Sequence, residues 1–195
     1  MTAIKTAGPN AFYDEKNHPT IFYELLFKSN LPQHELNIDR VAQEGTLVTV
    51  AGSETVGNSL TTLHFHLLNN PAKLARLREE LVQAMPDAKH TPTWQELKKL
   101  PYLTACIEEN LRISASIPYH LARMTPKQGL KFQGWDIPPG TPVGMSIYLV
   151  HRMNPAIFPQ PDEFIPERWL GPDAKRLKKY LVPFAKGPRQ CLGIE

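Results

Sequence analysis

The chain has 195 residues, of which 42% are hydrophobic and 21% are charged, and its formal net charge is +3. This composition predicts one globular domain with a sizeable core rather than a disordered chain. The small net charge, mixed in sign, argues against nucleic-acid binding, which concentrates Lys and Arg on one face. No apolar run reaches the roughly 18 residues of a membrane helix and the N-terminus lacks a signal-peptide layout, so the chain alone is predicted to be soluble.

The two cysteines, Cys106 and Cys191, need separate explanations. Without a secretory signal a reducing compartment is favoured over a disulfide, and two thiols are too few for a four-ligand zinc site. The 19 prolines gather after Pro118. The first part of the chain is therefore predicted to be helical and the second part rich in loops.

Residues from about 35 to 68 predict one long helix. The segment contains no proline and keeps apolar residues at helical spacing until Asn69, Asn70 and Pro71 close it. Its centre, "TVAGSETVG", is weak, because each glycine there costs about 1 kcal/mol relative to alanine. This weakness indicates a functional reason, such as the close approach of a ligand.

A second helix is predicted over "PAKLARLREELVQAM", residues 71–85, behind Asn70 as its N-cap. Leu74, Leu77 and Leu81 form its apolar stripe. Further along, Thr93 and Glu96 have the spacing of a capping box.

The next helix is predicted over about 101–114, beginning at Pro101. Leu103, Ile107 and Leu111 are expected to face inward, and Cys106, beside that face, is interpreted as a small core residue.

After Pro118 the segment "LKFQGWDIPPGTPVGMSIYLV" predicts two short strands joined by a turn at Pro138, Pro139 and Gly140. Residues 151–180 then carry many prolines and little periodicity. Irregular stretches of this length are uncommon in compact proteins, so we expect specific interactions or a function to keep this one ordered.

The segment "PFAKGPRQCLG", residues 183–193, has the spacing F-x-x-G-x-R-x-C-x-G, with Phe184, Gly187, Arg189, Cys191 and Gly193 at the named positions. A thiolate is a soft ligand for iron, and flanking glycines let backbone N–H groups turn toward the sulfur. The arginine can pair with a carboxylate of a bound group, and the phenylalanine can pack on its flat face. A lone cysteine is usually only a buried residue, but five matched positions favour a haem ligand.

This segment resembles the cysteine-ligand loop of the cytochrome P450 family, the haem-thiolate monooxygenases. The resemblance implies haem b with Cys191 as the axial thiolate ligand of its iron. "AGSET", residues 51–55, resembles the family's oxygen-side helix pattern. There Ala51 and Gly52 would leave room for haem and dioxygen, while Thr55 and Glu54 would deliver protons as a general-acid relay. Taken alone, so short a pattern would favour a simpler interpretation, with Glu54 as a solvated acid and the Thr55 hydroxyl bonded to its own helix.

In "EENLR", Glu109 and Arg112 lie three residues apart and so on one helix face. Alone, they would be an ordinary surface ion pair. The segment resembles the family's E-x-x-R motif, and "FIPERW" resembles its P-E-R segment, which adds Arg168. The resemblance therefore implies a structural network of Glu109, Arg112 and Arg168 that orders the irregular region.

"SIPYHLARM" resembles the family segment that meets the haem propionates, so Arg123 and His120 would join Arg189 as carboxylate partners, although a lone arginine is often just exposed. The basic cluster comprises Lys175, Arg176, Lys178 and Lys179. In the family it would lie on the thiolate side of the haem, where an acidic reductase docks; alone, it could be a solvated loop.

The resemblance covers nearly the whole chain from about His18 onward and is greatest to fungal members. It implies a mainly α fold with a small β-sheet (α+β), with residues 1–195 forming the C-terminal part of the cytochrome P450 fold, incomplete at both ends. A full-length relative would be held at the cytosolic face of the endoplasmic reticulum membrane by an N-terminal anchor that is absent here.

The implied activity is insertion of one oxygen atom from O2 into a small apolar organic substrate, with electrons from NADPH through a separate reductase. The same haem could also serve an isomerisation or a peroxide-driven reaction. The alternative from another class is a truncated, non-enzymatic remnant that binds haem weakly or not at all.

Overall fold

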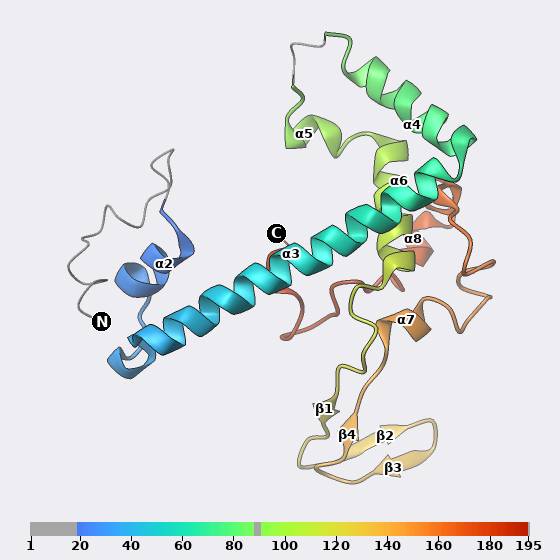
Figure 1. The fold of residues 1–195 in the computed structure, drawn as a ribbon. Coiled ribbons are helices and arrows are strands. Elements are labelled where there is room, and N and C mark those ends of the chain that lie inside the picture. Colours follow the sequence, from blue (N-terminus) through green and yellow to red (C-terminus); the bar gives the residue numbers. More distant parts are fainter. Residues whose placement is uncertain (1–18, 88–90, 195) are drawn as a thin grey trace. The chain divides into compact units, whose positions relative to one another are not determined.

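The structure is a computed structural model that describes residues 19–87 and 91–194. The chain divides into two compact units, residues 1–54 and 55–195. Helices predominate and the described strands form two small antiparallel sheets (Figure 1), which confirms the predicted α+β class.

The first unit contains α2 (Ile21–Tyr23), a π-helical turn (Glu24–Lys28), a 3-10 turn (Gln33–Leu36) and the first part of α3 (Ile38–Leu68). The long helix begins at Ile38 rather than near residue 35 because Asn37 adopts an extended conformation. The Asn37 Oδ1 atom accepts a hydrogen bond of 2.9 Å from the backbone N–H of Arg40, which is the contact of an N-cap.

The second unit begins with the last part of α3 and continues with shorter helices. These are α4 (Pro71–Ala84), α5 (Trp94–Leu97), α6 (Pro101–Ser114), α7 (Ile147–Val150) and α8 (Ala174–Leu177), with 3-10 turns at Pro166–Trp169 and Leu192–Ile194. The capping box is confirmed, since the Thr93 N–H donates to Glu96 Oε2 at 2.7 Å. Asn70 occupies the N-cap position of α4, as predicted, but its side chain makes no capping hydrogen bond. Its Nδ2 donates to the carbonyl of His66 at 2.7 Å instead.

Helices α4 and α6 share a core with the end of α3. Its buried members are Leu67, Leu77, Tyr102, Cys106, Ile113 and Phe164. The predicted stripe of α4 is confirmed, because Leu77 is buried and Leu74 and Leu81 pack against this core. Cys106 is fully buried, as predicted, and burial raises the pKa of its thiol to about 12, so the thiol stays protonated.

The buried face of α6 agrees only in part with the predicted one, because Leu103 packs against this core as expected but other positions differ. Ile107, expected to face inward, is 38% exposed, whereas Glu109, Asn110 and Arg112 are at most 2% exposed. Apolar spacing misplaced this face because charged groups with complete hydrogen bonding can be buried as well as apolar ones.

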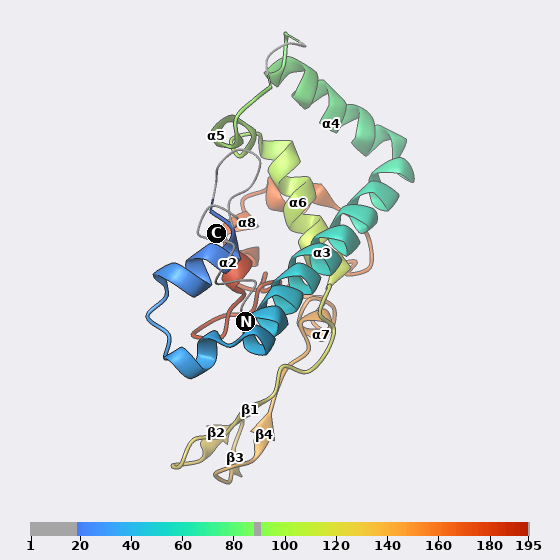
Figure 2. The same ribbon diagram turned by 60° about the vertical axis from the view of Figure 1, so that its left-hand side comes forward.

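The sheets are β1 (Arg123–Met124) paired with β4 (Pro142–Val143), and β2 (Leu130–Phe132) paired with β3 (Trp135–Ile137). The predicted turn at Pro138, Pro139 and Gly140 is present between β3 and β4, where the N–H of Thr141 donates to the carbonyl of Pro138 at 3.3 Å. The structure adds a second turn that was not predicted. The two-residue turn at Gln133 and Gly134 joins β2 to β3, and both residues have positive φ, +48° and +86°, as in a type I′ turn. The strands on either side of residues 138–140 belong to different sheets, and residues 147–150 form α7 rather than a strand (Figure 2).

Candidate functional site

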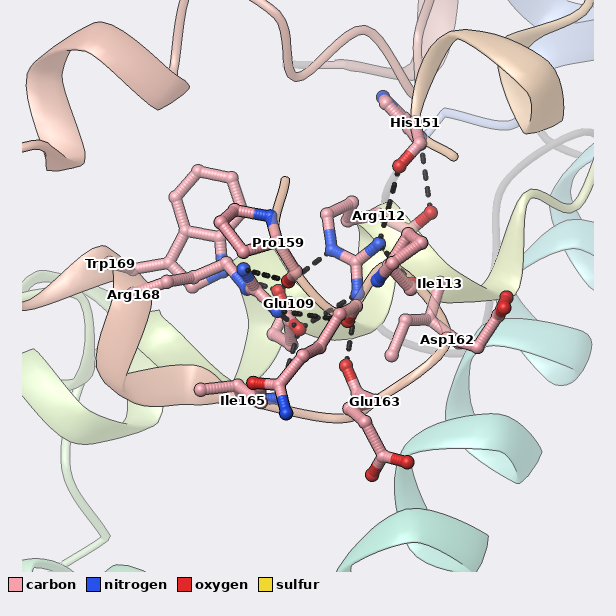
Figure 3. A network of polar contacts seen from close by, with 12 residues as sticks. Glu109, Arg112, Ile113, His151, Pro159, Asp162, Glu163, Ile165, Arg168 and Trp169 are labelled. Carbon is pink, nitrogen blue, oxygen red and sulfur yellow. Dashed lines mark hydrogen bonds and ion pairs between the residues drawn. The ribbon is translucent and has the colours of Figure 1, made fainter. Parts of the chain in front are cut away.

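A buried carboxylate on α6 is the centre of a polar network (Figure 3). Glu109 is 0% exposed, and its Oε1 accepts hydrogen bonds from Arg112 Nη2, the Ile165 N–H and Arg168 Nε at 2.9, 2.9 and 3.1 Å. Its Oε2 accepts from Arg112 Nε at 3.0 Å and from Trp169 Nε1 at 2.9 Å. The structure thus brings Glu109, Arg112 and Arg168 together as one network and adds Trp169 to it.

The two arginines bind backbone carbonyls of the irregular segment. Arg112 donates to the carbonyls of His151, Pro161 and Glu163 at 3.4, 2.6 and 3.1 Å. Arg168 donates to those of Pro159 and Gln160 at 3.0 and 3.4 Å. Guanidinium groups therefore satisfy carbonyls that a helix or a sheet would otherwise satisfy, and this orders the proline-rich stretch.

The cysteine loop, residues 183–193, lies at the surface. Cys191 is a free, exposed thiol, and its backbone N–H donates to the carbonyl of Phe184 at 2.9 Å. Gly187 has a φ of +80°, which favours glycine, and a Cβ at Gly193 would lie 3.9 Å from the Cys191 Sγ atom. The loop is closed by its own backbone and leaves the sulfur accessible.

The predicted oxygen-side residues fall in both units. Ala51, Gly52 and Glu54 are exposed residues of the first unit. Apart from the chain neighbours of Gly52 and the nearby backbone of its own helix, no atom of the described residues lies within 4 Å of a Cβ built on Gly52. Thr55 is half-buried in the second unit, where its carbonyl accepts from Ser116 Oγ at 3.4 Å.

Three basic residues, Arg123, His120 and Arg189, are the predicted partners of the haem carboxylates, and all three are exposed. Arg123 lies in β1, where its Nη1 donates to the carbonyls of Leu121 and Ala122 at 3.3 and 2.9 Å. His120 forms an isolated bridge with Ser146, and Arg189 lies in the exposed part of the cysteine loop.

The basic cluster around α8 is partly paired. Arg176 contacts Asp173 at 3.0 Å and Lys178 contacts Glu108 at 2.7 Å. Lys175 and Lys179 are exposed.

The residues present fit a haem. Within residues 19–87 and 91–194, no three His, Cys, Asp or Glu side chains gather to hold a metal ion. The single accessible cysteine sulfur, that of Cys191, suits an iron whose other ligands come from a macrocycle. Exposed arginines are suitable partners for the carboxylates of such a group.

Sequence reasoning missed His151, Trp169 and Asn110. Asn110 Nδ2 donates to the carbonyl and the Oγ of Ser59, at 2.9 and 2.8 Å, and so ties α6 to α3. No local pattern indicates such partners, because their contacts span 51 residues or more for Asn110 and Trp169 and 39 for His151 with Arg112.

None of the helices in the described parts of the chain has the length and apolarity of a membrane span.

Known proteins of similar sequence identify the family of this chain. The family model described as "Cytochrome P450" matches residues 5–195. The chain is 45% identical to the cytochrome P450 monooxygenase sdnE of Sordaria araneosa, over 91% of this chain and 35% of the relative. It is 41% identical to the N-acetyltryptophan 6-hydroxylase ivoC of Emericella nidulans, over 94% and 36%, and 38% identical to the fusicoccadiene C-8 hydroxylase of Phomopsis amygdali, over 93% and 35%.

The chain therefore spans about a third of the length of these curated fungal relatives. The match of the family model over nearly all of its residues, together with these identities, settles its membership. The chain belongs to the cytochrome P450 family.

Proposed function

We propose that this chain contributes the thiolate ligand and part of the proton-delivery machinery of a haem-thiolate monooxygenase. The observation that carries the proposal is the contrast between the two cysteines: Cys106 is buried with a raised pKa, whereas Cys191 is free and exposed in a closed loop. When bound, haem b would supply the redox and oxygen-activating chemistry.

The cysteine loop would bind and orient the group. Cys191 Sγ would be the ligand, Phe184 would pack on the flat face, and Gly187 and Gly193 would let the backbone come close. Arg189, Arg123 and His120 would pair with its carboxylates, which requires only that these exposed side chains stay accessible.

The turn from Ala51 to Thr55 in α3 would serve the oxygen side. Ala51 and Gly52 are small and leave room, while the Thr55 hydroxyl would donate a proton and the Glu54 carboxyl would replace it through water. The carbonyl of Thr55 is bonded to Ser116, which fixes the backbone that carries the hydroxyl.

The relatives' names suggest the substrate class. Because two of them are named as hydroxylases of organic molecules, we infer hydroxylation of a small, largely apolar organic substrate. Electrons would come from NADPH through a separate reductase that docks on Lys175, Arg176, Lys178 and Lys179, at the cytosolic face of the endoplasmic reticulum membrane.

The test is the absorption spectrum of the 195-residue chain, reconstituted with haem and reduced under carbon monoxide. We expect a red-shifted, thiolate-type Soret band in the parent chain and its complete loss in Cys191→Ala, with Cys106→Ala as the control that keeps it. An identical band in the parent and in Cys191→Ala would overturn the assignment of the ligand.

The proton-delivery role has a separate test in the active protein. Thr55→Ala should keep the thiolate-type band and lower the yield of product per NADPH oxidised severalfold, because protons then reach oxygen without control. Thr61→Ala, on an exposed position of the same helix, is the matched control. Unchanged coupling in Thr55→Ala would exclude the hydroxyl from this role.

A further inference from the structure

His151 lies fully buried between α6 and the chain that leads into the cysteine loop. Its Nδ1 is 3.1 Å from the carbonyl oxygen of Arg112, and the backbone N–H of Val182 donates to its Nε2 at 3.1 Å. Arg112 returns the contact, since its Nη1 donates to the carbonyl of His151 at 3.4 Å (Figure 3). The imidazole therefore bridges two segments that are distant in the sequence.

The two partners determine the form of the ring. A carbonyl only accepts and a backbone amide only donates, so Nδ1 carries the proton and Nε2 presents its lone pair. The ring of Phe158 meets the imidazole edge-on, with centroids 5.9 Å apart and an interplanar angle of 87°, which fixes its orientation.

Val182 stands at the entry of the cysteine loop. The next residue, Pro183, restricts Val182 to extended conformations. Phe184 follows, and its carbonyl accepts the hydrogen bond from the N–H of Cys191 that closes the loop. Two hydrogen bonds, one at Val182 and one at Phe184, thus connect the imidazole to the backbone of the thiol-bearing residue.

We propose that His151 is a positioning residue for Cys191: its neutral ring ties the entry of the cysteine loop to α6 and thereby sets the place of the thiol. The consequence for iron ligation rests on the proposed function. The hydrogen bond between His151 and Val182 does not, because it lies within the protein itself. His151 touches no substrate or cofactor in this assignment and acts through Val182.

Three variants distinguish the hydrogen bond between Val182 and His151 from simple packing of the ring. His151→Gln places an amide oxygen near the position of Nε2 and can still accept from Val182, whereas His151→Asn reaches only the position of Nδ1. His151→Phe fills the space and makes neither bond. His64→Gln is the control, because His64 is an exposed histidine of α3.

The first measurement is amide hydrogen exchange in the haem-free 195-residue chain. We expect exchange at Val182 and Cys191 to be about tenfold faster in His151→Asn and His151→Phe, which corresponds to the loss of one hydrogen bond, and close to the parent rate in His151→Gln. Amides in the middle of α4 should not change in any variant. Equal exchange rates at Val182 and Cys191 in His151→Asn and His151→Gln would overturn the proposal. Because only these two variants are compared, the test holds even if His151→Phe does not fold.

The second measurement is the thiolate-type band of the haem-loaded, carbon monoxide-treated chain. The band should weaken in His151→Asn and His151→Phe and be rescued in His151→Gln. A parent chain without this band would contradict the proposed function, while the exchange rates would still decide whether His151 positions the loop.

Discussion

At the scale of single residues, the charge balance of the Glu109 network explains why removing one of its side chains should destabilise the protein. One carboxylate, that of Glu109, faces the two guanidinium groups of Arg112 and Arg168, and none of the three side chains is more than 8% exposed. The remaining N–H groups of the arginines are directed to carbonyl oxygens, so the excess positive charge is surrounded by negative ends of dipoles. Removing one of these side chains should therefore lower the stability of the fold, because it leaves a buried charge without its counter-ion.

Glu109→Gln should therefore lower the free energy of unfolding by about 3 to 5 kcal/mol, since it leaves two buried cations without a counter-ion. Urea denaturation of the chain measures this change. Glu108→Gln is the matched control: Glu108 pairs with the half-exposed Lys178, and the expected loss is less than about 1 kcal/mol. Equal losses in the two variants would contradict the role of the network.

Spacing alone was sufficient to predict Glu109 and Arg112 as partners, because residues three apart share a helix face. The place of Arg168 came from resemblance to the family. Trp169 and His151 could not be predicted, since their bonds to Glu109 and Arg112 depend on the path of an irregular segment with no periodicity.

At the scale of elements, the N-terminus of α6 is capped by another helix. The carboxylate of Glu80, on α4, accepts hydrogen bonds from the N–H groups of Tyr102 and Leu103, both at 2.8 Å. Pro101, the first helical residue, has no N–H to satisfy. One side chain thus satisfies two free donors and places a negative charge at the positive end of α6.

Glu80→Ala should lower the free energy of unfolding by about 1 to 2 kcal/mol, as loss of a good N-cap does. Glu79→Ala, on the exposed face of the same helix, should change it little. The midpoints of thermal unfolding of the two variants give the comparison. A Glu80→Ala midpoint no lower than that of Glu79→Ala would contradict the capping role.

Long periodic elements were predictable and short ones were not. The stripe of α4 follows from leucines at helical spacing, and the boundary of α3 differs only where Asn37 caps it. The β2–β3 hairpin was not predicted, because Gln133 and Gly134 form its turn and the prolines nearby give the stronger turn signal.

At the scale of the whole molecule, the buried His151 and the half-buried His66 couple stability to pH. Burial is the main cause that lowers the pKa of His151 to about 4, and the guanidinium groups of Arg112 and Arg152 lower it further. The backbone carbonyls of Arg112 and Tyr180 act in the opposite direction, because they would stabilise the protonated ring. His66, stacked on Phe164, also has its pKa lowered, first by burial. The unfolded chain therefore binds protons at a higher pH than the native chain does.

Stability should fall as the pH drops from 6.5 toward 4, since only the unfolded state gains the proton in this window. For His151 the loss between pH 7 and pH 5 is about 2 kcal/mol. Urea denaturation at both pH values measures it. His151→Gln should flatten the dependence and His64→Gln should leave it unchanged; the same slope in the parent chain and in His151→Gln would exclude His151 as its source.

The reliance of residues 159–165 on guanidinium groups from other segments also bears on the order of folding. Helix α6 has contacts within its own turns and can form early, but the carbonyls of Pro161 and Glu163 have no partner until Arg112, 49 and 51 residues away, is in place. The segment has no nucleus of its own, and the entropy cost of closing so long a loop precedes any gain from its non-local contacts. Its ordering is therefore a late, non-local step, and substitutions there should accelerate unfolding rather than slow folding.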